Sequence, residues 1–407
     1  MSRRHRSVAA RTRLRRGAIT AALLGVAGLG VMPAAGSAAT RDVVVVGNAF
    51  AGTVSFLDGS TFQNLGSFNA VPDLASRKAA LLLNPVSLVG WNVVKSQKGG
   101  ENYIDDVALS PDGRRLYVSR GILEDVAAFD IQTKKMLWRV GVNSFNSDHM
   151  ALSPDGSKLV VSATTSGRDR VIDTATGALI TTFAAGDYPH GVDYSADGKR
   201  VYVGSIGTTA LPYALNALKG DKLLTVADAT TWQVLKTFKF DYGVRPTVIT
   251  SDERYAYIQR SYNRGFIEFD LNAGKTTRTA TLPGTKAGDA LFPDNLPANS
   301  MHHGLAFNGS ETKLCNAGTI DNQISIVDRA TFAVQSTVSG YAKPYWATTD
   351  RSGTKCIVSN STGNYIAVID YGTGREVART PVGWYPQRER LGVLDTAAAA
   401  ALSASAG

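Results

Sequence analysis

One pattern of apolar and polar positions recurs along almost the whole chain. An apolar run is followed by a Ser-Pro-Asp-Gly-like turn, a second apolar run of the type Leu-Tyr-Val, and a Val-x-Asp segment. The clearest copies read IDDVALSPDGRRLYVS at 104–119, HMALSPDGSKLVVS at 149–162 and HGVDYSADGKRVYVG at 190–204. Weaker copies begin at Thr247, His303 and Trp346. Short apolar runs separated by tight turns predict an all-β repeat protein.

The spacing of the copies specifies the kind of repeat. A period of about 40–45 residues with four short strands is typical of a β-propeller blade. Complete copies span 104–142, 149–184, 190–240, 247–282, 303–338 and 345–382. The segment 43–68 supplies only three strands, and the segment after Trp384 resembles the start of an innermost strand. We therefore predict a seven-bladed β-propeller of four-stranded antiparallel blades, in which N- and C-terminal strands share one blade and leave no open sheet edge.

The beginning of the chain has the composition of an export signal. An arginine-rich start precedes the apolar run 19–31, which is too short to span a bilayer, and the small residues Ser37-Ala38-Ala39 follow. We predict a signal peptide over 1–39, export by the Sec or twin-arginine route, and a secreted, extracellular protein. The propeller domain would then occupy 40–395, followed by a disordered Ala/Ser-rich tail at 396–407. No second membrane segment is evident.

The net charge changes once the signal peptide is set aside. The whole chain has a formal charge of +9, but residues 1–39 contain seven arginines and no acidic residue, which leaves about +2 for the mature chain. The basic character therefore belongs mainly to the signal peptide. It gives no reason to expect nucleic acid as a partner.

Two cysteines, Cys315 and Cys356, occur in the whole chain. Each falls in the second strand of its predicted blade, and the two blades are adjacent. An even pair in an exported protein is a candidate disulfide. Two buried thiols are the alternative.

The strands at 116–119 and 201–204, with the Ser-Pro-Asp-Gly turns before such strands, resemble the YVTN-repeat family of seven-bladed propellers. The resemblance covers nearly all of the mature chain. It implies a broad group that includes YncE-like secreted binding proteins, lactonase-like enzymes and the haem-carrying domain of a nitrite reductase. This chain has no Cys-x-x-Cys-His motif, so a covalently bound c-type haem is not expected. No catalytic signature of the lactonase-like or lyase relatives matches it residue by residue.

Long insertions distinguish one face of the predicted propeller. The segments 69–103 and 283–302 connect blades, and 206–221 connects the second and third strands of its blade. In a four-stranded blade these connections share one face. Long loops gathered on one face of a rigid scaffold favour a binding or catalytic function there.

Four histidines lie in the propeller region, and all stand where an innermost strand begins: His149, His190, His302 and His303. Alignment of the blades on their hairpin turns places His190 and His303 in one column with Asp105, Asp148 and Tyr345. Equivalent positions are related by rotation about the propeller axis, so we expect them to converge at the channel mouth. His149 falls in the next column, so its side chain need not join the others.

Histidine and carboxylate side chains around a channel suit two kinds of chemistry. Both are ligands for zinc and related divalent ions, and histidine is suited to acid–base catalysis near neutral pH. We predict His190, His303, Asp105 and Asp148 as catalytic residues, with His190 and His303 also as ligands of a divalent metal. The alternative is that these side chains only bond loop backbone or cap strand ends.

Basic and aromatic residues are expected at the same mouth. The six predicted ligand-binding residues are Arg120, Arg260, Arg245, Tyr345, His149 and His302. Arginine forks and aromatic rings suit an anionic or polar organic ligand. Packing between blades is the alternative for the aromatic residues.

Two functions fit these patterns. The first is an exported, monomeric propeller that binds a small polar or anionic molecule at the channel mouth and acts on it as a His/Asp-dependent, metal-assisted hydrolase, lyase or isomerase. The second is a non-catalytic propeller that binds a protein or cell-wall polymer of the envelope through its decorated face. A deep convergent pocket favours the first function, and a broad exposed patch favours the second.

Overall fold

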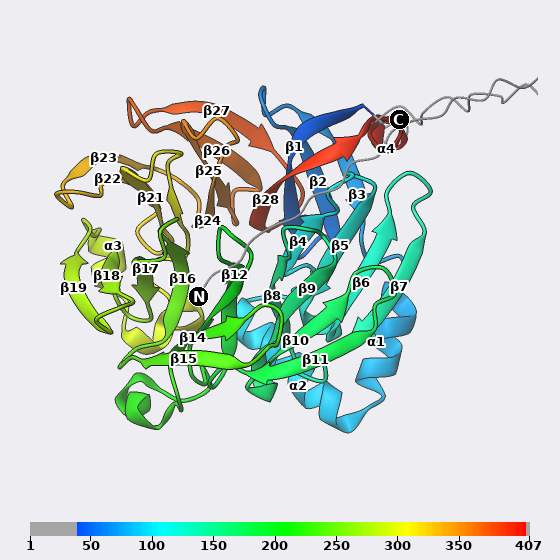
Figure 1. Ribbon diagram of the computed structural model, residues 1–407, viewed down its shortest axis with the longest axis horizontal. Helices are drawn as coiled ribbons and strands as arrows, with labels where there is room; N and C mark the ends of the chain where they lie inside the picture. Colours follow the sequence, from blue (N-terminus) through cyan, green and yellow to red (C-terminus); the bar gives the residue numbers. More distant parts are fainter. Residues whose placement is uncertain (1–38, 404–407) are drawn as a thin grey trace, which may run out of the picture. The chain divides into compact units, whose positions relative to one another are not determined.

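A computed structural model describes residues 39–403 of the chain. These residues form seven four-stranded antiparallel sheets arranged as the blades of a β-propeller (Figure 1). The predicted fold class and the predicted number of blades are confirmed. In Figure 1 the innermost strands β28, β4, β8, β12, β16 and β24 surround the centre.

The strands of the first four blades, from the innermost strand outward, have the following bounds. They are β28 (Pro386–Asp395), β1 (Thr40–Asn48), β2 (Thr53–Asp58) and β3 (Asn64–Asn69); β4 (Asp106–Leu109), β5 (Arg115–Arg120), β6 (Asp125–Asp130) and β7 (Met136–Gly141); β8 (Ser147–Leu152), β9 (Lys158–Ala163), β10 (Arg168–Asp173) and β11 (Leu179–Ala184); β12 (Pro189–Tyr194), β13 (Arg200–Ser205), β14 (Leu223–Asp228) and β15 (Val234–Lys239).

The remaining three blades follow the same order. Their strands are β16 (Val244–Ile249), β17 (Tyr255–Arg260), β18 (Phe266–Asp270) and β19 (Lys275–Ala280); β20 (Leu305–Phe307), β21 (Lys313–Gly318), β22 (Gln323–Asp328) and β23 (Val334–Ser339); β24 (Pro344–Thr349), β25 (Lys355–Asn360), β26 (Tyr365–Asp370) and β27 (Glu376–Pro381).

The position of a strand within its blade explains its residue pattern. Middle strands are packed between neighbouring blades on both faces, so strands such as β5 and β9 bury nearly every residue. Outermost strands have solvent on one side, and in β7 and β27 half-buried and exposed residues alternate. A continuous apolar run in the sequence therefore indicates a middle strand, and an alternating run indicates an outermost strand.

The two ends of the described chain close the ring. Strand β28 pairs antiparallel with β1, with Val44 opposite Leu391 and Thr40 opposite Asp395. The prediction that N- and C-terminal strands share one blade is confirmed. Closure in this way satisfies the backbone groups of both terminal strands and leaves no exposed edge at the seam.

Cys315 and Cys356 form a disulfide between adjacent blades. They lie in β21 and β25, the second strands of their sheets, and their Cα atoms are 6.3 Å apart. Both are fully buried in an apolar cluster with Ile326 and Val358. Of the two alternatives that the sequence left open, the structure contains the disulfide.

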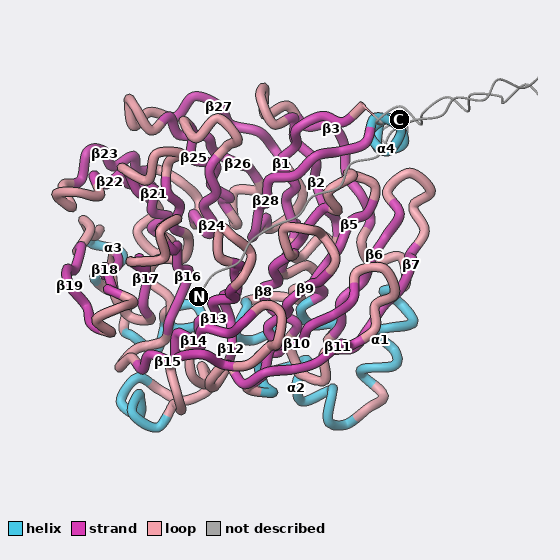
Figure 2. The backbone as a smooth tube through the Cα atoms, viewed as in Figure 1, coloured by secondary structure: helices cyan, strands magenta, loops and turns pink. Residues whose placement is uncertain are grey.

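The long insertions contain the helices. Figure 2 shows α1 (Leu74–Leu82) and α2 (Pro85–Lys98) side by side, both from the first insertion. The insertion 206–221 contains η3 (Tyr213–Leu218). The insertion 283–302 contains α3 (Lys286–Asp289), η4 (Pro293–Asn295) and η5 (Pro297–Asn299). Helix η1 (Gly121–Leu123) follows β5, and η2 (Thr164–Ser166) follows β9.

Helix α2 has clear start and stop signals. The Asn84 side chain accepts hydrogen bonds from the backbone N–H groups of Val86 and Ser87, and Pro85 occupies the first turn. Gly99 ends the helix in the left-handed conformation with φ of 76°. These caps place Lys98, the last helical residue, where α2 meets the propeller.

The end of the described chain differs from the expectation. Residues 396–403, expected to belong to a disordered tail, form helix α4 (Thr396–Ser403). The Asp395 side chain accepts hydrogen bonds from the backbone of Ala397 and Ala398, and alanine has the highest helix propensity. Ala398 and Leu402 are fully buried in the core. The Ala/Ser-rich composition alone predicts a flexible segment, whereas packing of α4 against the first blade stabilises the helix.

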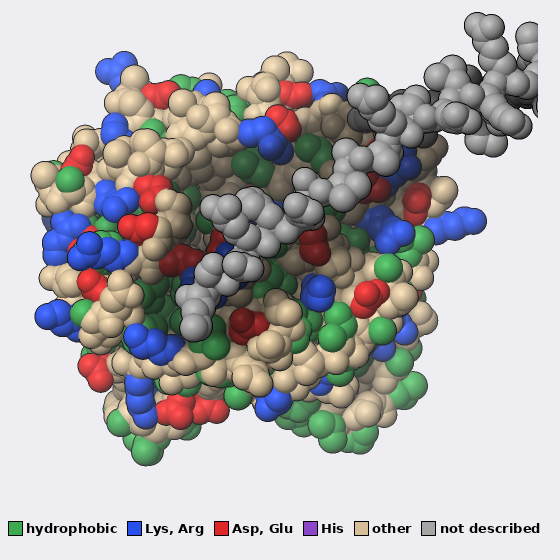
Figure 3. All heavy atoms as spheres, viewed as in Figure 1, with side chains coloured by type: hydrophobic (Ala, Val, Ile, Leu, Met, Phe, Trp, Pro, Cys, Tyr) green, Lys and Arg blue, Asp and Glu red, His purple; other side chains and the backbone are tan. Residues whose placement is uncertain are grey.

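Residues 1–38, which carry nearly all of the predicted signal peptide, and residues 404–407 lie outside the described residues. Within 39–403, no helix combines the length and apolar character needed to cross a lipid bilayer. Figure 3 shows basic and acidic side chains interspersed on the visible face. This mixture agrees with the small net charge expected of the mature chain.

The disulfide yields a stability prediction. The two cysteines are separated by 41 residues in sequence, and a crosslink over such a loop stabilises the folded state by about 4 kcal/mol through the entropy of the unfolded chain. We expect the Cys315→Ala/Cys356→Ala variant to lose about this much unfolding free energy in urea titrations against the oxidised wild type. Equal unfolding midpoints with equal slopes would contradict the prediction.

Candidate functional site

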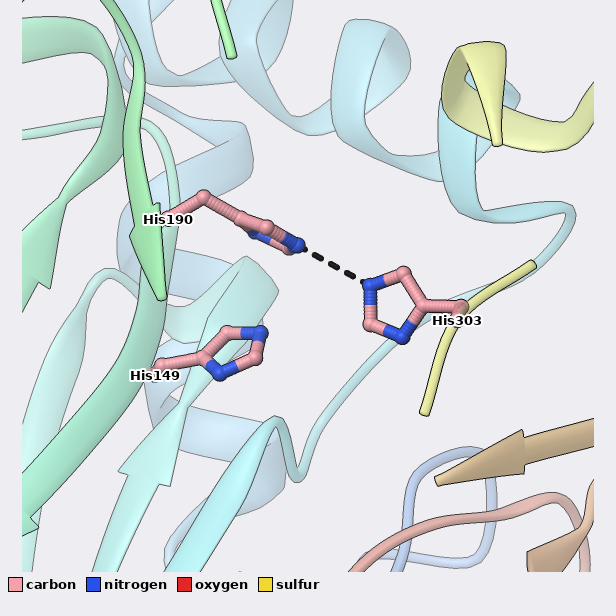
Figure 4. A group of neighbouring side chains, drawn as sticks. All are labelled: His149, His190 and His303. Carbon is pink, nitrogen blue, oxygen red and sulfur yellow. Dashed lines mark hydrogen bonds between the residues drawn. The ribbon is translucent and has the colours of Figure 1, made fainter. Parts of the chain in front are cut away.

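Three histidines converge at the channel mouth. His149 lies in β8, His190 lies in β12, and His303 lies two residues before the start of β20. The side chains are 1–2% exposed, and their ligating nitrogens lie within 4.8 Å of one another. Figure 4 shows the imidazoles pointing toward one another, with the Nε2 atoms of His190 and His303 2.9 Å apart. The structure therefore brings together two predicted metal ligands and a third histidine that the column alignment had left aside.

Irregularities in the innermost strands explain this convergence. In β8, Ser147 pairs with Ala163 and Met150 with Val161, so β8 has one extra residue at Asp148–His149. Similar irregularities occur near the starts of β12, β16, β24 and β28. A β-bulge redirects side chains that a regular strand would point to opposite faces. Asp148 and His149 are consecutive, yet both contribute to the cluster.

The outer nitrogens of two imidazoles have fixed partners. His190 Nδ1 is 2.8 Å from Asp148 Oδ2, and His303 Nδ1 is 3.3 Å from the backbone oxygen of Tyr345. The Tyr345 ring also stacks on the His303 ring at 4.3 Å. A carboxylate and a carbonyl oxygen only accept hydrogen bonds, so both Nδ1 atoms carry the proton. In the neutral rings, both Nε2 atoms then present lone pairs to each other.

The surroundings keep these rings neutral. Burial lowers the pKa of His149, His190 and His303 well below the usual value. The Arg388 cation adds to this effect at all three rings, and Arg245 adds to it at His190 and His303. The buried Nε2 of His149 has no hydrogen-bond partner among the described residues. The cluster therefore offers unprotonated nitrogens that no protein donor satisfies.

Two carboxylates and two cations lie beside the histidines. Lys98 Nζ is 3.0 Å from Asp105 Oδ2 and 3.8 Å from Asp148 Oδ1. Arg388 forms an ion pair with Asp105, and its Nη2 is 3.6 Å from Asp148 Oδ1. Burial would lower the pKa of Lys98, but Asp105 and Asp148 raise it above the usual value. The charges of these four residues balance.

A second group with metal-ligand atoms in range consists of Asp105, Asp148 and His149. Its two carboxylates already face Lys98 and Arg388. A divalent cation there would be repelled by both side chains. The three-histidine group is the stronger candidate for a metal centre.

A cavity of about 310 Å³ adjoins the cluster. It is covered by α2, by the insertion after β13 and by Ala298 of η5. Its apolar lining includes Val93, Val94, Phe145 and Ile206, and its polar lining includes Lys98, Asp148, His190, Arg245 and Tyr345. The cavity reaches the histidine cluster at His190. All three long insertions thus contribute to its walls.

Arg245 is the one predicted ligand-binding arginine that lines this cavity. It is 1% exposed, its Nε donates to Ser261 Oγ at 3.0 Å, and its Nη2 donates to the backbone oxygen of Ala298. Burial lowers its pKa to about 10. No carboxylate among residues 39–403 forms an ion pair with it.

Other predicted ligand-binding residues lie away from the cavity. Arg120 is fully buried and pairs with Asp73 and Asp125. His302 is 3.2 Å from Asp321 Oδ2 and accepts a hydrogen bond from the backbone of Gly265. Both side chains therefore have their polar partners within the protein rather than in the cavity.

Arg260 lines a different hollow with Tyr262 and Arg264. The sequence did not single out Lys98 or Arg388 as site residues. Lys98 reaches the site through α2, which lies in a segment predicted to be a connecting loop. Arg388 lies in the closing strand β28, and that position was the available signal.

Fold and site define the class of protein: a seven-bladed β-propeller with a buried three-histidine cluster beside a cavity. No protein-family model matches the sequence, and no curated protein matches it, so the finer resemblance to the YVTN-repeat family stays an expectation.

Solved structures share the fold. Hydrazine synthase of Kuenenia stuttgartiensis is similar with a TM-score of 0.56 and 18% identity, over 73% of this chain and 96% of that chain. Dihydro-haem d1 dehydrogenase NirN in complex with DHE is similar with a TM-score of 0.51 and 14% identity, over 86% of this chain and 74% of that chain. Both are named as enzymes. At these identities the likeness shows the fold alone.

Substitution of Arg388 should reveal how far the buried charges depend on it. Arg388→Met leaves Asp105 and Asp148 with Lys98 as their main cation, and loss of one partner of a buried ion pair costs about 3–5 kcal/mol. We expect a decrease of that size in the unfolding free energy measured in urea. The control is Arg379→Met, whose ion pair with Glu376 is partly exposed and contributes about 1 kcal/mol or less. Similar losses in both variants would contradict the account.

Proposed function

We propose that this protein holds a divalent metal ion of the zinc type on His149, His190 and His303, and acts on a small polar or anionic molecule in the adjoining cavity. One observation carries the proposal. The Nε2 atoms of His190 and His303 face each other across 2.9 Å, and the acceptors at both Nδ1 atoms assign the ring protons to Nδ1, which leaves both Nε2 atoms unprotonated. Lone pairs at this distance repel unless a cation lies between them, and burial disfavours a proton in that position.

The distance between His190 and His303 suits an ion after a small adjustment. Zinc–nitrogen bonds are about 2.0–2.1 Å, so two nitrogens of a tetrahedral site are about 3.3 Å apart. The His190–His303 separation of 2.9 Å would widen by a few tenths of an ångström. The Asp148–His190 bond supplies the carboxylate contact that usually orients a metal-binding imidazole.

Three protein ligands, rather than four, are typical of catalytic zinc sites. Such an ion supplies a Lewis acid and lowers the pKa of a bound water. The chain's own residues would orient the ligands and exclude bulk water. Asp148 holds the tautomer of His190, while α2 and the insertion after β13 cover the cavity.

Hydrolysis fits the site better than elimination or isomerisation. Both of the latter need a free base beside the substrate. Asp105 and Asp148 are instead paired with Lys98, Arg388 and His190. We therefore propose a metal-dependent hydrolase.

Export is part of the proposal. The arginine-rich and apolar segments within 1–39 motivate it, and the Cys315–Cys356 disulfide supports it because such bonds persist mainly outside the cytosol. Membership of the YVTN-repeat family is proposed on the strand and turn motifs of the sequence.

The decorated face offers a second candidate function. The insertions carry large apolar side chains with high exposure, namely Leu83 at 84%, Phe292 at 73%, Leu218 at 69%, Val86 at 64% and Val89 at 60%. Exposed apolar side chains of this kind are typical of interaction surfaces. Binding of a protein or cell-wall polymer through this face is therefore the alternative.

The metal proposal predicts a defined stoichiometry. We expect the purified protein, after zinc loading and buffer exchange, to retain about one ion per chain in elemental analysis. His190→Ala/His303→Ala should lose it, because two of the three ligands are absent. The matched control is His302→Gln, which changes the neighbouring histidine that bonds Asp321 instead.

Chelation of the wild type gives a readout that does not depend on the variants folding. Zinc titrated into the chelated protein should bind with one-site stoichiometry. Absence of saturable binding would overturn the metal proposal. Retention of zinc by the folded double variant would show that the ion lies elsewhere.

A further inference from the structure

The cavity contains a buried positive charge that the protein does not neutralise. Arg245 lines it, is 1% exposed, and within residues 39–403 its guanidinium bonds a hydroxyl and a backbone oxygen but no carboxylate. Burial of an unpaired guanidinium is costly, and native proteins compensate such charges with an anion. The other fully buried arginines at the ring, Arg120 and Arg388, both have carboxylate partners.

The remaining charges of the cavity do not supply that anion. Asp105 and Asp148 are balanced by Lys98 and Arg388. With Arg245 included, the cavity has one positive charge in excess, and a metal ion on the histidines would increase it.

The walls limit the shape of the missing anion. Val93, Val94, Phe145 and Ile206 present apolar surface, and about 310 Å³ is at the lower end of small-molecule sites. Such walls disfavour a polyanion, whose several charges would lose hydration beside a single unpaired guanidinium. A single carboxylate matches the planar fork of one guanidinium.

We propose that the cavity binds a small monocarboxylate with an apolar body, its carboxylate on Arg245 and its apolar part against α2 and Ile206. This inference rests on the proposed function, since it names the ligand class of the same site. Arg245 and His190 line the same cavity. A carboxylate on Arg245 therefore leaves the rest of the molecule beside the metal-binding face of His190.

The experiment uses chelated, metal-free protein, so that a carboxylate cannot bind through zinc. Calorimetric titrations compare benzoate and hexanoate with acetate, benzamide and inorganic phosphate. We expect benzoate and hexanoate to bind at least tenfold more tightly than acetate, which lacks the apolar body. Benzamide has the same shape without the charge and should show no saturable binding, and phosphate should bind weakly or not at all.

Two variants assign the binding to a residue. Arg245→Met should weaken benzoate binding at least tenfold, whereas Arg260→Met should leave it unchanged, because Arg260 lines a different hollow. If Arg245→Met does not fold, the comparison of benzoate with benzamide in the wild type decides. Equal binding of benzamide and benzoate, or preference for phosphate, would overturn the inference.

The outcome is distinguishable from failure of the metal proposal. Benzoate binding that depends on Arg245 in a protein without zinc affinity supports the carboxylate site and contradicts the metal centre. Zinc binding without carboxylate binding supports the metal centre and contradicts the carboxylate site.

Discussion

Strand β28 pairs with β1 to close the ring, and the same strand carries Arg388 and Arg390 into the channel. Arg388 neutralises Asp105 and reaches toward Asp148, and Arg390 pairs with Asp106 at 2.7 Å. Buried carboxylates without such partners would take up protons or destabilise the fold. The polar channel mouth can therefore form only in a closed propeller. Closure of the ring and assembly of the site are the same structural event.

The histidine cluster departs from the rules that stabilise the rest of the fold. Strand β8 has an extra residue at Asp148–His149, as several other innermost strands do near their starts, and the buried imidazoles point unprotonated nitrogens at one another. The facing nitrogens do not help an isolated propeller to fold, since blades pack through their apolar strands. Local violations of the rules that stabilise a fold concentrate at functional sites. The metal ion and the carboxylate proposed above would each satisfy groups that the protein leaves unsatisfied.

Repeat spacing made the architecture predictable from the sequence. The spacing of the copies predicted the number of blades, and the missing innermost strand of the first blade predicted how the ring closes. The site was predictable only in part: the shared column predicted that His190, His303 and Asp148 converge, and the structure places His303 and Asp148 beside His190. His149 was left aside because a column alignment assumes regular strands, and a bulge has no reliable sequence signal. Tertiary partners decide what a charged side chain does, and the sequence does not show them. Lys98 was not predicted because it meets Asp105 only through α2. Arg120 was predicted to bind a ligand, but it is bonded to Asp73 and Asp125.

X-ray absorption spectroscopy at the zinc edge of the zinc-loaded protein tests the central claim most directly. The account predicts three imidazole nitrogens at about 2.0–2.1 Å, with the outer-shell scattering of their rings, and one further light ligand. A shell of oxygen ligands alone, without imidazole scattering, would contradict it.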